Sequence, residues 1–292
     1  MMLDTIRDTG PVVVGVDDSD SARDAARWAA DLAADWGAPL WLTHIVDRPG
    51  TLSAYPLPGW LRELGTSAER ARPGQTVTDV RYGSPGDQLL AQSHEARLLV
   101  LGSYGDAGWS GMLVGSNALR LVGACTCPLI VVRGSGPGIA PPRSGPVVVG
   151  VDGTAAGAEA LKFAATVASR SQHRRLVAVH TWSDVVSESG TPRRLDEDAS
   201  TLAARGAALL DQYLEPVLSE HPTLTVERHV RADTPLRALL DHARDAWLVV
   251  VGQRRDRPAA GMLVGSTSRG LIEFASCPVA VVPRQPERRS SG

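Results

Sequence analysis

A six-residue repeat limits the folds open to this chain more than any other feature. The hexapeptide Gly-Met-Leu-Val-Gly-Ser stands at residues 111–116 and again, unchanged, at 261–266. A second run, Val-Val-Val-Gly-Val-Asp, opens at residue 12 and recurs from residue 147. Because both runs return in the same order, the 292 residues are predicted to hold two copies of one domain.

The composition between the copies predicts where one domain ends and the next begins. Residues 135–144 are rich in glycine and proline, which is typical of a linker. We therefore assign domain 1 to residues 1–134 and domain 2 to residues 145–292.

Short apolar runs alternate with segments of helical periodicity in both copies. In domain 1 the pattern predicts strands and helices in turn, at residues 12–17, 19–36, 40–46, 61–71, 75–81, 85–95, 97–101, 117–123 and 128–132. Strands that alternate with helices pair in parallel through right-handed crossovers, and uniformly apolar strands are typical of sheets covered on both faces. The predicted fold class is α/β, with two repeated domains, each a five-stranded, parallel, doubly wound sheet.

Domain 2 is longer than domain 1 because of an insertion. His180 follows its counterpart His44 by 136 residues, whereas Thr234 follows Ser84 by 150. About 14 extra residues therefore lie between His180 and Thr234. We expect a long helix over residues 197–219 to absorb them.

The segment from Gly102 to Ser116 is the best candidate for a functional loop. A buried strand leads into this glycine-rich stretch, and a helix is expected to follow from Asn117. Glycine lets the backbone approach a ligand and adopt positive φ, and the first N–H groups of a helix favour an anion. The segment therefore predicts a phosphate site, with the amides of Gly115 and Ser116 as donors.

A carboxylate is placed to join this site. Asp17 ends the first predicted strand, and ligands of doubly wound sheets lie beyond the carboxyl ends of strands where the strand order reverses. If the strands that end at Asp17 and Gly102 are neighbours, Asp17 can bind a ribose or base, or help to hold a metal near phosphates. Ile45, near the end of the second strand, is then placed to line a pocket for an adenine ring. In the alternative interpretation, Asp17 only caps the following helix, and the glycines only form turns. Asp18, Ser19 and Asp20 are further candidates for this cap.

In these features the chain resembles the universal stress proteins, as a tandem of two domains. The resemblance rests on the opening Val-Val-Val-Gly-Val-Asp, on a Gly-x2-Gly-x9-Gly-Ser pattern, and on Cys-Pro-Leu-Ile-Val-Val at residues 127–132. It implies pairing of domains through the last strand and ATP as ligand, with or without Mg²⁺. By that likeness the nucleoside lies by Asp17 and Ile45, and the phosphates lie by Gly102, Gly105, Gly115, Ser116 and Asn117.

Domain 2 departs from the pattern at one position. Arg255 replaces the second glycine, whereas Gly252 and the pair Gly265-Ser266 are kept. Arg255 either supplies charge-assisted phosphate contacts or fills the pocket, and both outcomes stay open. The nucleotide-binding candidates of domain 2 are Asp152, Thr181, Gly252, Arg255, Gly265, Ser266 and Thr267.

Composition and missing motifs argue against several other classes of protein. A net charge of -2 gives no strong attraction to nucleic acid or to anionic membranes, and the sequence shows neither a signal peptide nor a membrane span. We therefore expect a cytoplasmic protein without nucleic-acid or membrane partners. The P-loop pattern Gly-x4-Gly-Lys-Ser/Thr is absent. The spacing of the cysteines predicts no metal site, and Cys125 and Cys127 are expected to be small buried residues.

The expected function is regulatory. We predict a nucleotide-binding module of the stress response or of dormancy, with its two domains paired inside the chain and two chains paired as a homodimer. Two alternatives stay open: a slow ATPase that uses the same crevice, and an interaction scaffold whose pockets bind no nucleotide. We predict no catalytic residues, because His44 and His180 lack a matching nucleophile and are expected to be structural or to line a pocket.

Overall fold

The computed structural model describes residues 9–47, 56–71, 74–104, 116–136, 138–170, 175–183, 185–188, 191–194, 198–253 and 265–284. The elements of the first half are β1 (Val12–Val16), α1 (Asp20–Trp36), β2 (Leu40–Val46), α2 (Gly59–Ala71), β3 (Thr76–Tyr82), α3 (Pro85–Ser93), β4 (Leu98–Gly102), α4 (Ser116–Ala124) and β5 (Leu129–Val132).

The second half repeats this order with one addition. Its elements are β6 (Val147–Gly150), α5 (Ala155–Ser169), β7 (Leu176–Trp182), β8 (Val185–Glu188), β9 (Thr191–Arg194), α6 (Ala199–Glu220), β10 (Val226–Ala232), α7 (Pro235–Ala243), β11 (Leu248–Gln253), α8 (Ser266–Phe274) and β12 (Val279–Pro283). All predicted strands and helices are therefore confirmed, with ends that differ by a few residues.

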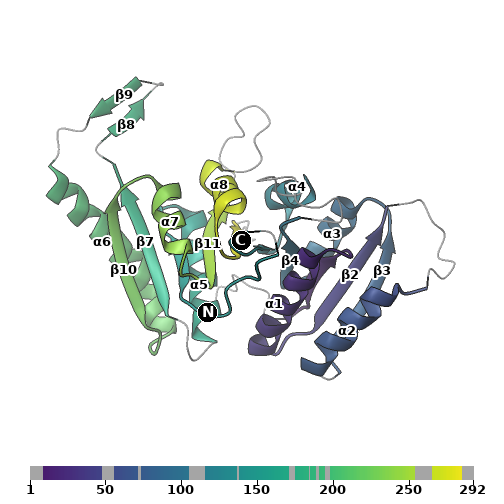
Figure 1. The fold of residues 1–292 in the computed structure, drawn as a ribbon. Coiled ribbons are helices and arrows are strands. Elements are labelled where there is room, and N and C mark those ends of the chain that lie inside the picture. The colour runs from purple at the N-terminus through teal and green to yellow at the C-terminus, as the bar shows by residue number, and fades with distance from the viewer. Residues whose placement is uncertain are drawn as a thin grey trace, which may run out of the picture.

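Ten strands form one continuous sheet in the order β10-β7-β6-β11-β12-β5-β4-β1-β2-β3 (Figure 1). Within each half the five strands pair in parallel. The halves meet where β12 pairs with β5 in antiparallel orientation, with Ala280 opposite Ile130. The predicted α/β class is thus confirmed, and the two halves pair inside one chain through their last strands.

Helix α1 shows how the sequence specifies a local element. The hydroxyl of Ser19 accepts a hydrogen bond from the Ala22 N–H at 3.1 Å and so caps the N-terminus. Gly37 ends the helix with a φ of 64°, the left-handed region that glycine adopts without strain. The predicted alanine face of α1 is buried, which lets the helix approach the sheet closely.

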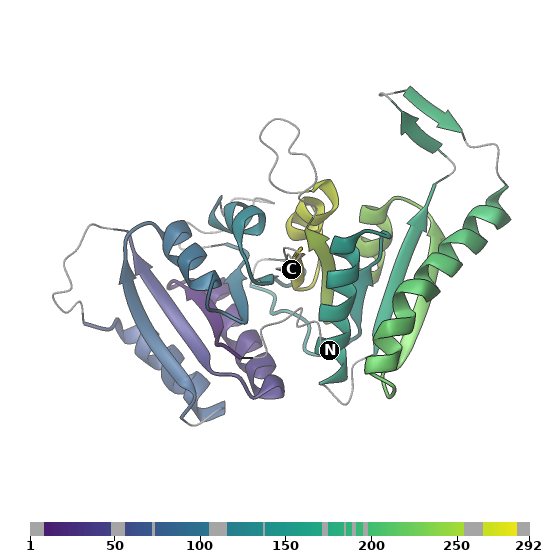
Figure 2. The same cartoon turned by 180° about the vertical axis from the view of Figure 1, so that it is seen from behind.

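Each face of the sheet carries its own hydrophobic core. One buried cluster lies under α1, α2, α5 and α6, and the other lies under α3, α4, α7 and α8. Both clusters contain residues of both halves, so apolar packing continues across the junction of β5 and β12. The two halves therefore share a core instead of meeting as separate globules (Figures 1 and 2).

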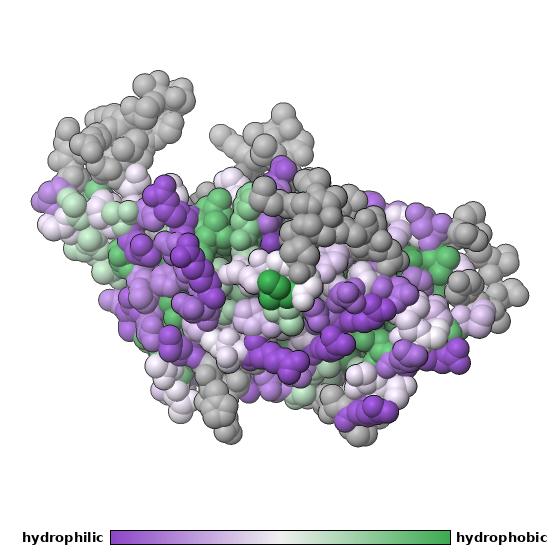
Figure 3. All heavy atoms as spheres, in the orientation of Figure 1, coloured by the Kyte–Doolittle hydropathy of each residue, from purple (hydrophilic) through white to green (hydrophobic). Residues whose placement is uncertain are grey.

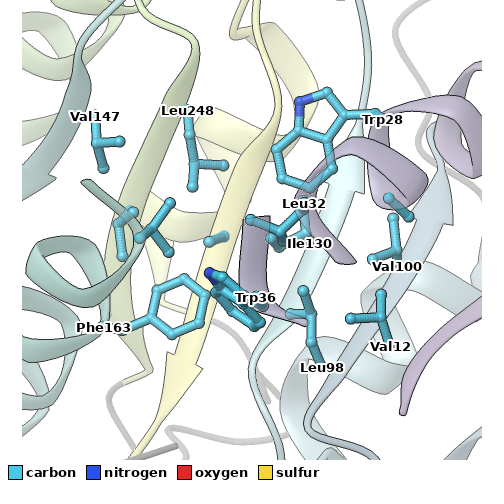
Figure 4. Packing of buried hydrophobic residues seen from close by; sticks show 14 of the residues in the cluster. Val12, Trp28, Leu32, Trp36, Leu98, Val100, Ile130, Val147, Phe163 and Leu248 are labelled. Atoms are coloured by element: carbon cyan, nitrogen blue, oxygen red, sulfur yellow. The ribbon is translucent and has the colours of Figure 1, made fainter. Parts of the chain in front are cut away.

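Aromatic side chains fill the junction on the α1 side. Trp36 of α1 lies edge-on to Phe163 of α5, with ring centroids 6.1 Å apart (Figure 4). Trp28 of α1 stacks on Trp247, which precedes β11, at 4.6 Å. On the same junction, Arg133 donates from Nη1 to the carbonyl of Ile272 in α8 at 2.6 Å. Burial lowers the pKa of Arg133.

The insertion of the second half forms more than the expected helix. Helix α6 has 22 residues against 13 in α2, so the prediction of a long helix is confirmed. Strands β8 and β9 were not predicted, and they form an antiparallel hairpin that stands clear of the body (Figures 1 and 2). Four-residue strands that pair only with each other carry too little periodicity to be recognised in the sequence.

Few large hydrophobic side chains are exposed on the described part of the chain. Figure 3 shows many hydrophilic side chains on one face, with paler and apolar ones between them. Only three large hydrophobic residues of the described ranges are exposed, and they are Val77, Ile139 and Phe274. None of the described helices combines the length and the hydropathy that a membrane crossing requires.

Candidate functional site

The strand order reverses once in each half. In the first half β1 lies between β2 and β4, so successive connections leave β1 in opposite directions. In the second half β6 lies in the same way between β7 and β11. We call the carboxyl ends of β1 and β4 the first switch point, and those of β6 and β11 the second switch point. Ligands of doubly wound sheets bind outside such points.

Asp17 lies at the first switch point, directly after β1. Its Oδ1 accepts hydrogen bonds from the backbone N–H of Ser19 at 3.2 Å and from the Ser19 hydroxyl at 2.5 Å. Ser19, and not Asp17, is the N-cap of α1. The half-buried carboxylate is therefore held in a fixed position at the edge of the sheet, where it supports the helix cap without being the cap itself.

Gly102 ends β4 beside this carboxylate, but its small size serves packing. A Cβ built at Gly102 would lie 2.5 Å from Oγ of Ser21 and 2.8 Å from the Ser21 carbonyl carbon. Gly102 is not among the glycines with positive φ. A glycine is needed here because the first turn of α1 occupies the space where a side chain would lie.

Ser21 is a site residue that the sequence analysis missed. Its side chain is 4% exposed, and its Oγ accepts hydrogen bonds from the backbone N–H of Ser103 at 2.8 Å and of Tyr104 at 3.4 Å. It therefore fixes the start of the glycine-rich loop against α1. A signal was present, since Ser21 follows the N-cap by two residues in the run Asp-Asp-Ser-Asp-Ser.

Ile45 and His44 stand side by side near the end of β2 and face opposite sides of the sheet. Ile45 is half-buried and packs against the cluster under α3 and α4. The Nδ1–H of His44 donates to the carbonyl of Val16 at 3.0 Å, and the ring lies edge-on to Trp60 at 5.0 Å. These contacts give His44 a structural role.

The remaining candidates of the first half are described only in part. Gly105 and Gly115 lie outside the described residues, as does Trp109. Helix α4 begins at Ser116, which agrees with the predicted strand, loop and helix order. The side chains of Ser116 and Asn117 lie outside the described part of the chain.

The second switch point repeats the carboxylate arrangement. Oδ1 of Asp152 accepts from the backbone N–H of Thr154 at 3.1 Å and from its hydroxyl at 2.6 Å. Thr154 caps α5 by accepting from the Gly157 N–H at 3.1 Å. His180 lies with Nδ1 2.8 Å from the Val151 carbonyl, as His44 does with Val16. Asp152 is exposed, whereas Asp17 is half-buried.

The other candidates of the second half spread along the same edge of the sheet. Thr181 is half-buried in β7. A Cβ at Gly252 would lie 2.4 Å from the Ala156 carbonyl oxygen, so this glycine also serves helix packing. Gly265 is the N-cap of α8, whose first residues Ser266 and Thr267 are exposed and half-buried. Arg255 lies outside the described residues.

Gln253 is a second residue that the sequence analysis missed. It ends β11 and is 3% exposed. Within the described ranges its Nε2 has no hydrogen-bond partner. The signal was a polar residue at the end of an otherwise apolar strand, directly after Gly252.

The cysteines are remote from this chemistry. Cys125, Cys127 and Cys277 are free and buried, as predicted for the first two. Burial raises the pKa of the Cys277 thiol to about 12, so this side chain stays protonated and is a poor nucleophile. Among the described residues no group of three histidine, cysteine or acidic side chains could hold a metal ion.

Comparison with known proteins gives a consistent result over nearly the whole chain. The model of the universal stress protein family matches residues 9–133 and 144–283. A universal stress protein of Mycobacterium tuberculosis is 33% identical over 291 residues, which cover 92% of this chain and 95% of the relative. One from Mycolicibacterium smegmatis is 32% identical over 289 residues, which cover 93% and 96%.

A solved structure shows the same fold at lower identity. A universal stress protein from Archaeoglobus fulgidus matches with a TM-score of 0.63 and 18% identity, covering 94% of this chain and 98% of its own. These matches, together with the strand order that repeats in the two halves, identify the chain as a member of the universal stress protein family, with two family domains in tandem.

Proposed function

We propose that the chain binds ATP at the first switch point and acts as a regulatory nucleotide-binding module. The observation that carries the proposal is the position of Asp17. Its carboxylate is held by Ser19 at 3.2 Å and 2.5 Å, at the carboxyl edge where the strand order reverses. A carboxylate held in place at this edge can accept hydrogen bonds from ribose hydroxyls without reorganising on binding.

The neighbouring elements are suited to bind the base and the phosphates of ATP. Ile45 is a half-buried apolar side chain at the end of β2, suited to contact an adenine ring. Helix α4 begins at Ser116 after the glycine-rich loop, and the N–H groups at a helix start favour phosphate. Asp18 and Asp20 both pair with Arg23. If Mg²⁺ accompanies ATP, Asp17 at the carboxyl edge of β1 is the carboxylate that would contact it.

Regulation follows if ATP binds one conformation or one partner-bound state more tightly than another. A ligand can shift such an equilibrium only by its difference in affinity between the states. The shared core of the two halves provides a continuous packed route between the two switch points. The proposed output is therefore a change in partner binding, and not a chemical product.

Equilibrium dialysis with labelled ATP tests the proposal. The wild-type chain is expected to bind ATP, and Gly115→Glu is expected to lose the first site because a carboxylate would meet the phosphates. Gly265→Glu is the matched control, since it places the same charge at the second switch point and should leave the first site intact. Unchanged binding in Gly115→Glu would contradict the placement, and no binding by the wild type would favour a scaffold. Steady phosphate release that Asp17→Ala abolishes would favour an ATPase instead.

A further inference from the structure

Strand β3 is a free edge of the sheet in the described part of the chain. It ends the ten-stranded sheet and pairs with β2 alone (Figure 1). The carbonyl of Gln75 and the N–H of Gly83 bind β2, and the main-chain groups of successive residues in a strand point to alternate sides. Those of Thr78, Val80 and Tyr82 therefore point away from β2, where a further strand could pair with them.

Strand β10 ends the sheet on the other side, and charged side chains protect its edge. Glu227 and Arg228 are exposed, and Arg228 pairs with Asp211 of α6 at 2.8 Å. Charges on an edge strand oppose pairing with another chain. The residues of β3 that match Glu227 and Arg228 in the repeat are Val77, which is 48% exposed, and Thr78. Of the two edge strands, β3 is therefore the one suited to pair with another strand.

The two charged side chains of β3 are complementary to those of a second copy of the same strand. Asp79 and Arg81 lie on one face, where Arg81 donates from Nε to Oδ2 of Asp79 at 2.7 Å. Val80 lies on the other face and packs against the cluster under α1 and α2. In an antiparallel pair with a two-fold axis at Val80, Asp79 lies opposite the partner's Arg81, and Arg81 lies opposite the partner's Asp79. Opposite charges across two paired strands stabilise the pair.

Other registers of the same pair are less favourable. A two-fold axis at Asp79 or at Arg81 would place like charges opposite each other, which destabilises paired strands. An axis at Thr78 would need the N–H of Thr76, which already donates to Oε2 of Glu69 at 3.2 Å. The axis that passes between Asp79 and Arg81 is therefore the register in which both the charges and the outward main-chain groups are matched.

We propose that two copies of this chain associate through their β3 strands, in antiparallel orientation, with Asp79 opposite the partner's Arg81. The main-chain groups of Thr78, Val80 and Tyr82 then pair with those of the partner. This surface is at the far end of the sheet from β10 and is separate from the junction of β5 and β12 that joins the halves within one chain. The inference gives the homodimer expected from the sequence a defined surface, and it does not rest on the proposed binding of ATP.

Sedimentation equilibrium of the full chain with charge-reversal variants tests the inference. The wild type is expected to form a dimer at micromolar concentration. Asp79→Arg and Arg81→Asp each place like charges opposite each other, so each should raise the dissociation constant at least about tenfold. An equimolar mixture of the two variants should form a heterodimer, because each chain then supplies the charge that the other lacks.

Two further variants separate association from folding. His229→Arg is the matched control, because it places an arginine at the position of β10 that corresponds to Asp79, and it should leave the dimer intact. A chain that carries both Asp79→Arg and Arg81→Asp has opposite charges across the axis again and should dimerise like the wild type. Recovery in this chain would show that the loss in the single variants comes from charge and not from misfolding.

Three outcomes would overturn the inference. A wild type that is monomeric at every concentration measured would leave this edge to a strand of another protein. Wild-type affinity in Asp79→Arg would place the dimer on another surface. A mixture of the two single variants that stays monomeric would refute the register. Binding of labelled ATP, measured in the same samples, is expected to be equal in wild type and Asp79→Arg, so a chain that dimerises without binding ATP would refute the proposed function alone.

Discussion

The two switch points share their aspartate and histidine contacts and differ in the loops that follow the first strands. Both have an aspartate that holds the hydroxyl cap of the next helix, through Ser19 in the first half and Thr154 in the second. Both have a histidine that donates to the carbonyl next to that aspartate. Because these features recur in both halves, they form the common frame of the two switch points.

The loops after the first strands are held by different forces. In the first half Arg23 pairs with Asp18 and Asp20. In the second half Gly153 stands at the matching position with a φ of 76°, and its carbonyl accepts from the Tyr213 hydroxyl at 2.6 Å. The long helix α6, which carries Tyr213, thus replaces surface ion pairs. The difference shows that helix α6 holds the loop of the second switch point through Tyr213.

The largest expected effect tests whether the two strand-end glycines serve packing. Gly102→Ala and Gly252→Ala should each lower the free energy of unfolding by about 3 kcal/mol, because the new Cβ would clash with the backbone of Ser21 or Ala156. Urea denaturation of the full chain measures it. Gly59→Ala in α2, where a Cβ meets nothing, is the control and should change little. A stable Gly102→Ala chain that no longer binds ATP would instead make this glycine a ligand residue.

A smaller effect sharpens the contrast between Ser21 and Ala156. Ser21→Ala should lower the free energy of unfolding by about 1–2 kcal/mol, because the N–H groups of Ser103 and Tyr104 lose their acceptor. Denaturation in urea again provides the measurement. The reciprocal variant Ala156→Ser should not produce a loss of the same kind. Equal stability of Ser21→Ala and the wild type would show that the hydroxyl does not hold the loop.

The smallest expected effect is a pH dependence of stability that comes from α7 and has no counterpart in α3. His242 of α7 matches Gln92 of α3 in the repeat, and burial, together with His229 and Arg231, lowers its pKa below 6.5. The unfolded chain therefore takes up a proton first as the pH falls below 6.5, so this stabilising contribution is present above 6.5 and is lost below it.

Melting temperatures of the wild type and of His242→Gln between pH 7.5 and pH 5.5 measure this contribution. The wild type should lose more on acidification, by about 2 °C or less, since the glutamine variant has no proton to take up. Asp241 and Glu227 oppose the shift, which keeps it small. Parallel pH profiles of the two proteins would show that His242 does not contribute.

Much of the fold could be predicted from the sequence. The repeats identified two related units, and apolar runs such as Val12 to Val16 identified buried strands, because uniform apolarity is required where helices cover both faces. The hairpin of β8 and β9 could not be predicted, since its strands pair only with each other. The role of Gly102 was also hidden, because a glycine in a strand looks the same whether a ligand or a helix approaches it.

By itself, the sequence determined the repeated elements, their order and the family, because these depend on periodicity and on motifs that recur along the chain. The resemblance also implied pairing through the last strand, and the pairing of β5 with β12 confirms it. Only the tertiary structure decided that Ser21 holds the distant N–H groups of Ser103 and Tyr104, and that Nε2 of Gln253 is buried without a partner in the described chain. Such features depend on contacts between segments that are distant in the sequence, and no local sequence pattern predicts those contacts.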